Sequence, residues 1–322
     1  MNIVTSYFLV RALPGTIALG GDVVEHQQAR QQEYLECLRR NQQHPDVASI
    51  HLLVEGADAY EHLLRHVMGN ADAQRSTSAP LTGHRDRRRH TAPVVPVLCG
   101  SSSSSSGVSS MPLYSDFFLH ANRLLPHRLT MVCNADVYLS PGHFSCSAVA
   151  ELFRCARDLP CHWPSSPLSS SAAARPSSSA GEAAADLPKA NALALALTRY
   201  ESDHLLDAPF LYDYRGSHDA FVVVPPVPSS FLRRVAHPQN SYKAENVVLH
   251  ELQRSGYVTL NPTLGDGARL VHRHAADLRQ WFPPVDESRY ALAPPSTVAQ
   301  AASRIRDEVH ARSSSPPPRP PV

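Results

Sequence analysis

Apolar runs and amphipathic stretches alternate along the first part of the chain. A mostly apolar run at residues 2–8 predicts a buried strand, and a second such run covers 49–54. Between them, residues 27–41 carry their large apolar side chains at helical spacing, and about 58–67 repeats that pattern. The order strand, helix, strand, helix is typical of a mostly parallel sheet covered by helices.

The same two patterns return in the rest of the chain. Short apolar runs predict further strands, and apolar residues three and four positions apart predict further helices. The expected strands are 91–98, 128–133, 192–198, 220–224, 257–261 and 268–272, and the expected helices are about 114–124 and 244–255. We therefore expect an α/β fold with a mixed, mostly parallel sheet.

Two segments interrupt this pattern with residues that offer little to bury. Serine, alanine, proline and arginine accumulate at about 69–110 and 164–188, a composition typical of disordered insertions. Residues 313–322 are proline-rich and predict a disordered or polyproline-like tail. Since 43% of the residues are hydrophobic, the remainder of 1–312 can bury a core. We therefore expect one domain over 1–312, with two insertions and a tail.

Charge and cysteine content narrow the class of protein. The chain has 30 basic and 29 acidic residues and a formal net charge of +1 with histidine neutral, which argues against nucleic acid as a partner. The six cysteines show no C-x-x-C spacing. We therefore expect free thiols in a reducing compartment rather than a zinc or redox centre.

The sequence shows neither a targeting signal nor a membrane segment. Its N-terminus lacks the basic lead and the small-residue cleavage site of a signal peptide. No apolar stretch approaches the roughly twenty residues that span a bilayer. These features predict a cytoplasmic protein without a membrane span, or a Golgi-lumen protein whose anchor is missing from this chain.

Polar residues follow the apolar run at 128–133. The triplet Asn134-Ala135-Asp136 stands at the carboxyl end of the expected strand, where open α/β sheets bind ligands. A carboxylate at that position can hold a divalent cation, which can neutralise the diphosphate of a leaving nucleotide. The same triplet is also typical of a turn in which Asn134 and Asp136 bond the local backbone.

Two further carboxylates stand at element boundaries. Asp219 precedes the apolar run 220–224, and Glu245 lies with Asn246 in the first turn of the expected helix 244–255. A carboxylate at Asp219 can act as a general base for an acceptor hydroxyl or can orient a donor sugar. Structural alternatives stay open for both, because aspartate is common in turns and a carboxylate is favoured in the first turn of a helix.

A pair of histidines occurs late in the chain. His272 and His274 flank Arg273, and in an extended segment they would share one face, where an imidazole can ligate a cation or bind a phosphate. Histidine is frequent in this sequence, so a polar strand end is the alternative interpretation. Arg199 and Arg279 are further candidates for contacts to a diphosphate.

Short motifs from one end of the chain to the other form an ordered series. They are I-V-T-S-Y-F at 3–8, E-Y and C-L at 33–38, I-H-L-L-V-E at 50–55, Y-S-D-F-F at 114–118, A-N at 121–122, N-A-D-V-Y at 134–138, A-L-T-R-Y at 196–200, G-S-H-D-A-F at 216–221, E-N at 245–246, G-Y at 256–257, N-P at 261–262 and H-R-H at 272–274. In this order they resemble a family of glycosyltransferase-like proteins. The resemblance implies a single Rossmann-like domain with the GT-A type of nucleotide-sugar-binding fold.

The resemblance also implies roles for particular residues. The triplet 134–136 stands where such enzymes carry an Asp-x-Asp-like motif for metal and nucleotide, Asp219 and Glu245 lie near the donor or acceptor sugar, and a late histidine completes the cation site. Two positions depart from the family pattern, because Asn134 and Glu245 stand where aspartate is expected. A neutral Asn134 would hold a cation less tightly. The candidates for binding the nucleotide sugar are then Asn134, Asp136, Arg199, Asn246 and Arg279.

The first hypothesis is therefore a glycosyltransferase that moves a sugar from a nucleoside-diphosphate sugar to an acceptor. Mn²⁺ or Mg²⁺ would be held by Asp136 with His272 or His274, and Mn²⁺ suits a mixed oxygen and imidazole site better. A non-catalytic binding protein with partner-binding insertions is the alternative. A nucleotidyltransferase is disfavoured because residues 11–15 make too poor a glycine-rich loop. Convergence of Asp136, Asp219 and a late histidine would favour the enzyme.

Overall fold

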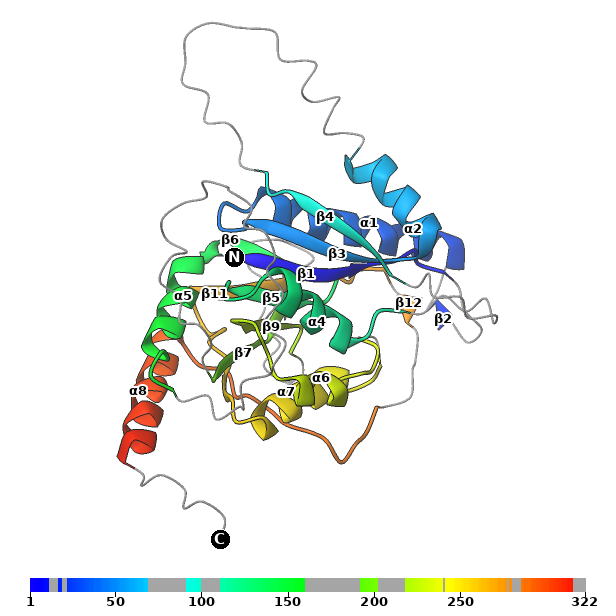
Figure 1. Ribbon diagram of the computed structural model, residues 1–322. Helices are drawn as coiled ribbons and strands as arrows, with labels where there is room; N and C mark the ends of the chain where they lie inside the picture. The colour runs from blue at the N-terminus through cyan, green and yellow to red at the C-terminus, as the bar shows by residue number, and fades with distance from the viewer. Residues whose placement is uncertain are drawn as a thin grey trace, which may run out of the picture.

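A seven-stranded sheet lies at the centre of the protein, between two layers of helices (Figure 1). A three-stranded sheet and a two-stranded pair accompany it. The computed structural model describes residues 1–11, 17–18, 22–68, 91–99, 111–159, 192–201, 218–239, 241–276, 278–279 and 285–314. Over these residues the fold is α/β with a mixed, mostly parallel sheet, which confirms the sequence prediction.

The central sheet has the strand order β10-β7-β9-β5-β1-β3-β4. Neighbouring strands are parallel except where β9 pairs, because β9 runs antiparallel to both β5 and β7. The strands are β1 (Asn2–Tyr7), β3 (Ser49–Glu55), β4 (Val94–Cys99), β5 (Thr130–Cys133), β7 (Leu193–Leu197), β9 (Ala220–Val223) and β10 (Val258–Leu260). All but β9 therefore have their carboxyl ends at the same edge of the sheet.

The strand order reverses between β1 and β5. From β1 the chain continues outward through β3 to β4, and it then crosses back to place β5 on the other side of β1. Connections that leave two adjacent parallel strands in opposite directions open a crevice at their carboxyl ends, which is where open α/β sheets bind ligands. Residues that follow Tyr7 and Cys133 therefore stand at the position that the topology favours for a site.

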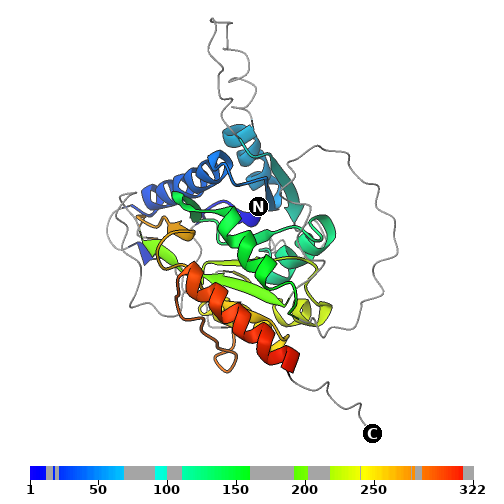
Figure 2. The same ribbon diagram turned by 90° about the vertical axis from the view of Figure 1, so that its left-hand side faces the viewer.

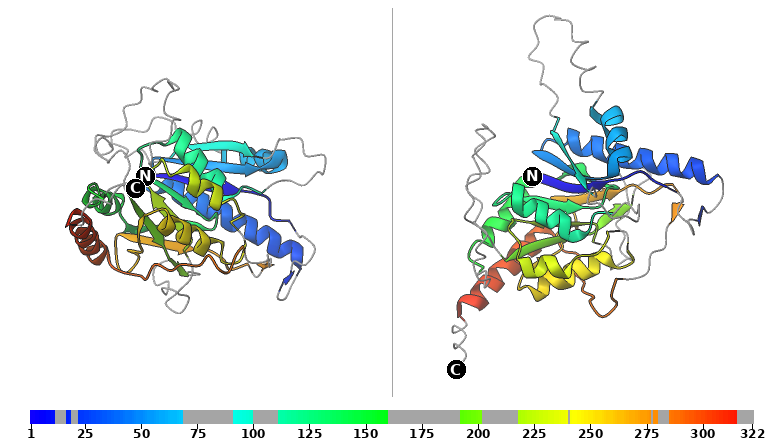
Figure 3. Two further views of the ribbon diagram at one scale, coloured as in Figure 1. Left: turned by 60° about the horizontal axis from the view of Figure 1, so that its bottom comes forward. Right: turned by 45° about the vertical axis from the view of Figure 1, so that its right-hand side comes forward.

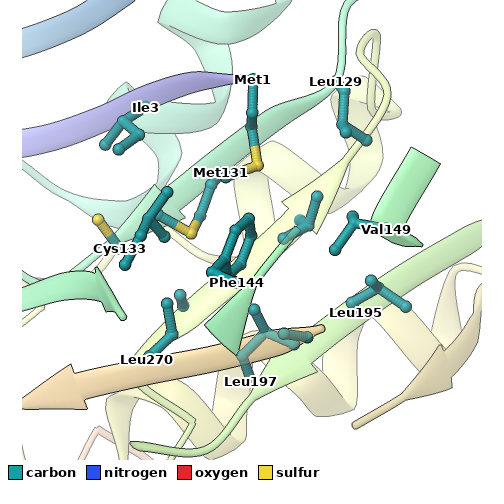
Figure 4. Close-up of a cluster of buried hydrophobic side chains, with 14 of the residues drawn as sticks. Met1, Ile3, Leu129, Met131, Cys133, Phe144, Val149, Leu195, Leu197 and Leu270 are labelled. Atoms are coloured by element: carbon teal, nitrogen blue, oxygen red, sulfur yellow. The ribbon is translucent and has the colours of Figure 1, made fainter. Parts of the chain in front are cut away.

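The apolar residues of the strands alternate between two helix layers. On β1 and β5, Ile3 and Met131 belong to one buried cluster, shown in Figure 4, whereas Val4 and Val132 belong to the other. Successive side chains of a strand point to opposite faces, so a strand buried on both faces has a continuous apolar run. This is why the runs in the sequence lack the alternation of a half-exposed strand.

One layer of helices packs on the cluster that contains Ile3. It consists of α1 (Val23–Gln43), α2 (Gly56–Leu63) with the π-helical turn η1 (Leu64–Met68), α5 (Cys146–Cys155) and α8 (Val298–Ser314). Helices α5 and α8 lie side by side (Figure 2). The layer on the opposite face consists of α4 (Tyr114–Leu124), α6 (Ser229–Arg234) and α7 (Ala244–Arg254), with α6 next to α7 (Figure 3).

The three-stranded sheet has the order β6-β11-β8. Strand β11 (Ala268–His272) runs antiparallel to β6 (Val137–Phe144) and parallel to β8 (Arg199–Glu201). Strands β6 and β8 follow β5 and β7 of the central sheet after a few residues. The small sheet therefore carries the chain away from the carboxyl edge of the large one. The remaining pair joins β12 (Leu278–Arg279) to β2 (Ile17–Ala18).

Several expectations about the insertions and the tail need correction. Strand β4 lies inside 69–110, so the bounds of the first insertion are too wide, although the strand pattern at 91–98 is confirmed. Helix α8 reaches Ser314, two residues into the expected tail. The second insertion, 164–188, and residues 315–322 lie outside the described residues.

The sequence analysis also missed the elements α5, α6, α8 and β6. In α8, Ala301 and Ile305 are buried in the core, and Val298, Ala302 and Val309 pack against it, a helical spacing that was overlooked in the sequence.

Two expectations about the environment of the chain can be compared with the structure. Over the described residues, none of the helices combines the length and the apolar character that crossing a bilayer requires. Free thiols are found at Cys37, Cys99, Cys133, Cys146 and Cys155, while Cys161 lies outside the described residues.

Candidate functional site

The register of the small sheet brings Asp136 and His272 together. On β11, His272 lies opposite Val137 of β6 and opposite Glu201 of β8. Because Asp136 directly precedes Val137, its carboxylate reaches the imidazole, and Oδ2 lies 3.1 Å from Nε2 of His272. The other ring nitrogen, Nδ1, lies 2.8 Å from Oε2 of Glu201. The imidazole is thus held between two carboxylates.

Helix α1 adds a buried ion pair to this arrangement. Nη2 of Arg30 lies 2.5 Å from Oδ2 of Asp136, and Nη1 lies 2.7 Å from Oε2 of Glu33. Both residues also bind the segment after β11: Arg30 donates to the carbonyl of Arg273, and Glu33 accepts from the backbone N–H groups of Ala275 and Ala276. The charged face of α1 therefore fixes the segment that carries His274.

The ladder between β5 and β9 places Asp219 next to Asn134. Beyond the last strand pair, the backbone N–H of Asn134 donates to the carbonyl of Asp219. Arg199, at the start of β8, then bridges the two sheets, with Nη1 2.7 Å from Oδ1 of Asp219 and Nε 2.7 Å from Oε1 of Glu201. A chain of ion pairs thus runs from Asp219 through Arg199, Glu201 and His272 to Asp136.

Asn134 connects this chain of ion pairs to helix α7. Its Nδ2 lies 3.4 Å from Oδ1 of Asp219 and 3.3 Å from Oε1 of Glu245, in the first turn of α7. On the other side, the hydroxyl of Tyr114 lies 3.5 Å from Oδ1 of Asn134. The neutral amide donates to two carboxyl groups, which an aspartate at the same position could not do.

The ion pairs shift the pKa values of their members. Burial raises the pKa of Asp136, but His272 and Arg30 outweigh it and hold that pKa well below its usual range. Burial lowers the pKa of His272, but the Asp136 and Glu201 carboxylates raise it to about 9. Burial raises the pKa of Glu201, whereas His272 and Arg199 lower it to about 2. Without a cation, this arrangement keeps His272 protonated at neutral pH, and a metal ion that used His272 as a ligand would have to displace that proton.

The pKa of Glu245 is raised, whereas the pKa values of Asp136 and Glu201 are lowered. Burial, followed by the negative charge of Asp219, raises the pKa of the Glu245 carboxyl group to about 7. Asn134 and Arg199 lower that pKa but do not compensate for the loss of solvation. A carboxyl group with a pKa near the working pH can both accept and return a proton, which is the property of a general base or acid.

Three atoms that could ligate a cation lie close together in the site. Asp136, His272 and His274 each offer one ligand atom, and these atoms lie within 4.8 Å of one another. Asp136 is only 13% exposed, and its Oδ1 is buried with no hydrogen-bond partner in the described part of the chain. An unpartnered carboxylate oxygen in a buried place is costly without a cation or donor beside it.

Most of the residues that the sequence singled out lie together, and two do not. The residues brought together are Asn134, Asp136, Arg199, Asp219, Glu245, His272 and His274. Asn246 points away, because it is buried and its Nδ2 donates to the carbonyl of Ala291. Arg279 forms part of the strand pair β12–β2, and its side chain lies outside the described residues.

Sequence reasoning missed Arg30, Glu33 and Glu201. Arg30 and Glu33 lie on the same stripe of α1 as the buried Tyr34 and Cys37. Two opposite charges on the apolar face of a predicted helix could have identified them, because charged side chains are rarely buried unless they are paired. Glu201 lies two residues after Arg199 and could have been found from strand alternation.

Together, the fold and the site define an α/β protein with a cluster of carboxylates, imidazoles and guanidinium groups at the point where its strand order reverses. Comparisons with protein-family models, with curated proteins and with solved structures gave no match for this chain.

Proposed function

We propose that the protein is a glycosyltransferase that moves a sugar from a nucleoside-diphosphate sugar to an acceptor hydroxyl, assisted by Mn²⁺ or Mg²⁺. The observation that supports this proposal is the convergence of Asp136, Asp219 and His272 at the carboxyl end of β5, through the contacts of Arg199 and Glu201. The site stands at the reversal of strand order, where α/β sheets bind ligands.

The residues present fit a divalent cation. Asp136, His272 and His274 would hold it, since Oδ1 of Asp136 is buried and without a hydrogen-bond partner among the described residues. One carboxylate oxygen and two imidazoles suit Mn²⁺ better than Mg²⁺, which prefers oxygen ligands alone. When bound, the cation neutralises the charge that develops on a leaving diphosphate.

The chain's own residues supply the remaining chemistry. Glu245, with its pKa raised to about 7, is the candidate base for the proton of the acceptor hydroxyl if the reaction inverts the sugar carbon. Asp219 is held by Arg199 and so serves better as a fixed acceptor for sugar hydroxyls than as a base. Asn134 donates to both carboxyl groups and fixes their relative positions.

A specific contact favours a second candidate, a binding protein without turnover. Nη2 of Arg30 lies 2.5 Å from Oδ2 of Asp136, so a guanidinium group already balances the carboxylate that a metal would use. Asn134 also removes one of the carboxylates that the resemblance leads one to expect. A nucleotide would then bind through arginine, without metal and without transfer of a sugar.

Thermal unfolding of the full chain with UDP, GDP, ADP, CDP and TDP, each with Mn²⁺ or with a chelator, separates these candidates. A ligand at about 100 times its Kd stabilises the native state by about 2.7 kcal/mol. The transferase requires a metal-dependent rise in unfolding temperature with at least one nucleotide. A rise that is independent of metal would favour the binding protein, and no rise with any nucleotide would contradict the transferase.

Variants link the rise in unfolding temperature to the site. Asp136→Ala should abolish it, but this change also removes a partner of the buried Arg30 and destabilises the fold. His274→Gln therefore serves as the milder variant, because the residue is only half-buried. It should weaken the metal-dependent rise while leaving the unfolding temperature without nucleotide nearly unchanged.

We include a cytoplasmic location in the proposal. The free thiols of Cys133 and Cys146 suit a reducing compartment.

A further inference from the structure

Two exposed tyrosines lie at the start of helix α7, next to the candidate site. Tyr242 is 46% exposed and Tyr290 is 42% exposed, and Leu292 nearby in sequence is exposed as well. The ammonium of Lys243 lies 5.2 Å from the ring centroid of Tyr242 and 5.6 Å from that of Tyr290. Both rings lie within cation–π reach of one atom, so they are neighbours around Lys243, and we call the two rings the tyrosine platform.

The tyrosine platform is fixed to the site by the backbone. Lys243 caps α7 in the left-handed conformation, with a φ of 61°, and Glu245 follows two residues later. Their Cα atoms are therefore at most about 7 Å apart. The segment of Tyr290 is held by Asn246, whose side chain donates to the carbonyl of Ala291. The tyrosine platform is thus attached to the same end of α7 that carries Glu245.

We propose that the tyrosine platform binds the carbohydrate of the acceptor substrate, an inference that rests on the proposed function. One face of a pyranose ring presents C–H groups, whose partial positive charge is attracted to the negative face of an aromatic ring. Sugar hydroxyls can accept hydrogen bonds from Lys243 and donate them to Glu287, which lies 3.7 Å from the ammonium. The platform therefore offers both the apolar faces and the polar groups that a sugar needs.

The size of the tyrosine platform favours a small ligand over a protein partner. The exposed parts of the two rings amount to on the order of 200 Å², whereas a stable protein interface buries about 800 Å² on each partner. The neighbouring Lys243 and Glu287 are charged, and charged residues are depleted from the cores of protein interfaces. An acceptor site must lie near the base, and Tyr242 and Lys243 directly precede the helical turn that carries Glu245.

The test uses the full chain and four disaccharides as probes: maltose, cellobiose, lactose and N,N′-diacetylchitobiose. Saturation-transfer NMR should detect binding of at least one of them to the wild type. The double variant Tyr242→Ala/Tyr290→Ala should weaken that binding about tenfold, the loss expected for one aromatic stacking contact. The double variant Tyr242→Phe/Tyr290→Phe keeps the rings and should bind as the wild type does.

Leu124→Ala, an exposed apolar residue at the end of α4, serves as the control and should not change binding. Failure of all four disaccharides to bind, or equal binding by the alanine double variant, would overturn the proposal. The proposal would also be overturned if the wild type self-associates and the alanine double variant does not. The surface would then bind a second copy of the chain.

The outcome can be separated from that of the proposed function. Nucleotide binding without disaccharide binding would contradict carbohydrate binding at the tyrosine platform but would not contradict the proposed transferase. If disaccharide binding requires the two rings but no nucleotide raises the unfolding temperature, the carbohydrate site is supported and the proposed transferase is contradicted.

Discussion

The side-chain nitrogen of Asn134 lies 3.3 Å from Oε1 of Glu245, between that carboxyl group and the carboxyl group of Asp219. An asparagine where the resemblance leads one to expect aspartate is therefore more than a lost metal ligand. The amide donates to two acidic groups that would otherwise repel each other. Asn134 and Glu245, the two residues that stand where the resemblance leads one to expect aspartate, are in contact with each other.

Replacing Asn134 by aspartate should destabilise the protein more at pH 8 than at pH 5. The new carboxylate cannot donate to Asp219 or Glu245, and we expect a loss of about 1–3 kcal/mol in the free energy of unfolding at pH 8. At pH 5 Glu245 is protonated and can donate to the new carboxylate, so the loss should be smaller. Urea denaturation with a chelator present measures both values. Equal losses at the two pH values would contradict the arrangement.

The raised pKa of Glu245 should make the protein less stable as the pH rises. In the folded state this carboxyl group titrates at about 7, whereas its ordinary pKa is 4.5. Between these values the native state holds a proton that the unfolded chain has released, so stability falls with rising pH and levels off above 7. Relative to Glu245→Gln, the wild type should lose about 2–3 kcal/mol between pH 4.5 and 8. A constant difference across that range would refute the shifted pKa.

Asp136→Asn should destabilise the protein by about 3–5 kcal/mol, because it breaks a buried ion pair and leaves Arg30 with less compensation. The matched control is Asp266→Asn. Asp266 also pairs with a histidine, His143, but its side chain is 76% exposed. Exposed pairs contribute at most about 1 kcal/mol, so the control should change little. Similar losses for the two variants in urea denaturation would show that burial of Asp136 does not matter energetically.

Glu33→Ala should loosen the segment after β11. Glu33 accepts from the backbone N–H groups of Ala275 and Ala276, and we expect these two amides to exchange with solvent about tenfold faster in the variant. Glu36→Ala is the control on the same helix, because Glu36 pairs with Arg40 instead. Hydrogen exchange followed by NMR or mass spectrometry reports both. Unchanged exchange at 275–276 would show that the carboxylate does not hold this segment.

The local pattern of the sequence determined most of the fold. Strands β1, β5 and β9 are buried along their whole length, and their largely apolar runs are legible without any tertiary information. The pattern also placed Asp136 and Asp219 at the ends of apolar strands. Helix α8 was overlooked, although Ala301 and Ile305 enter the core at helical spacing.

Only the tertiary structure decided which of these residues meet. Arg30 binds the backbone of Arg273, 243 positions away, and Asn134 reaches Glu245 across 111 positions. Such contacts depend on the register of β11 against β6 and on the antiparallel direction of β9, which follow from how whole elements pack. Periodicity in a sequence records which face of an element is buried, but the partner across that face is set by long-range packing, and so the site required the structure.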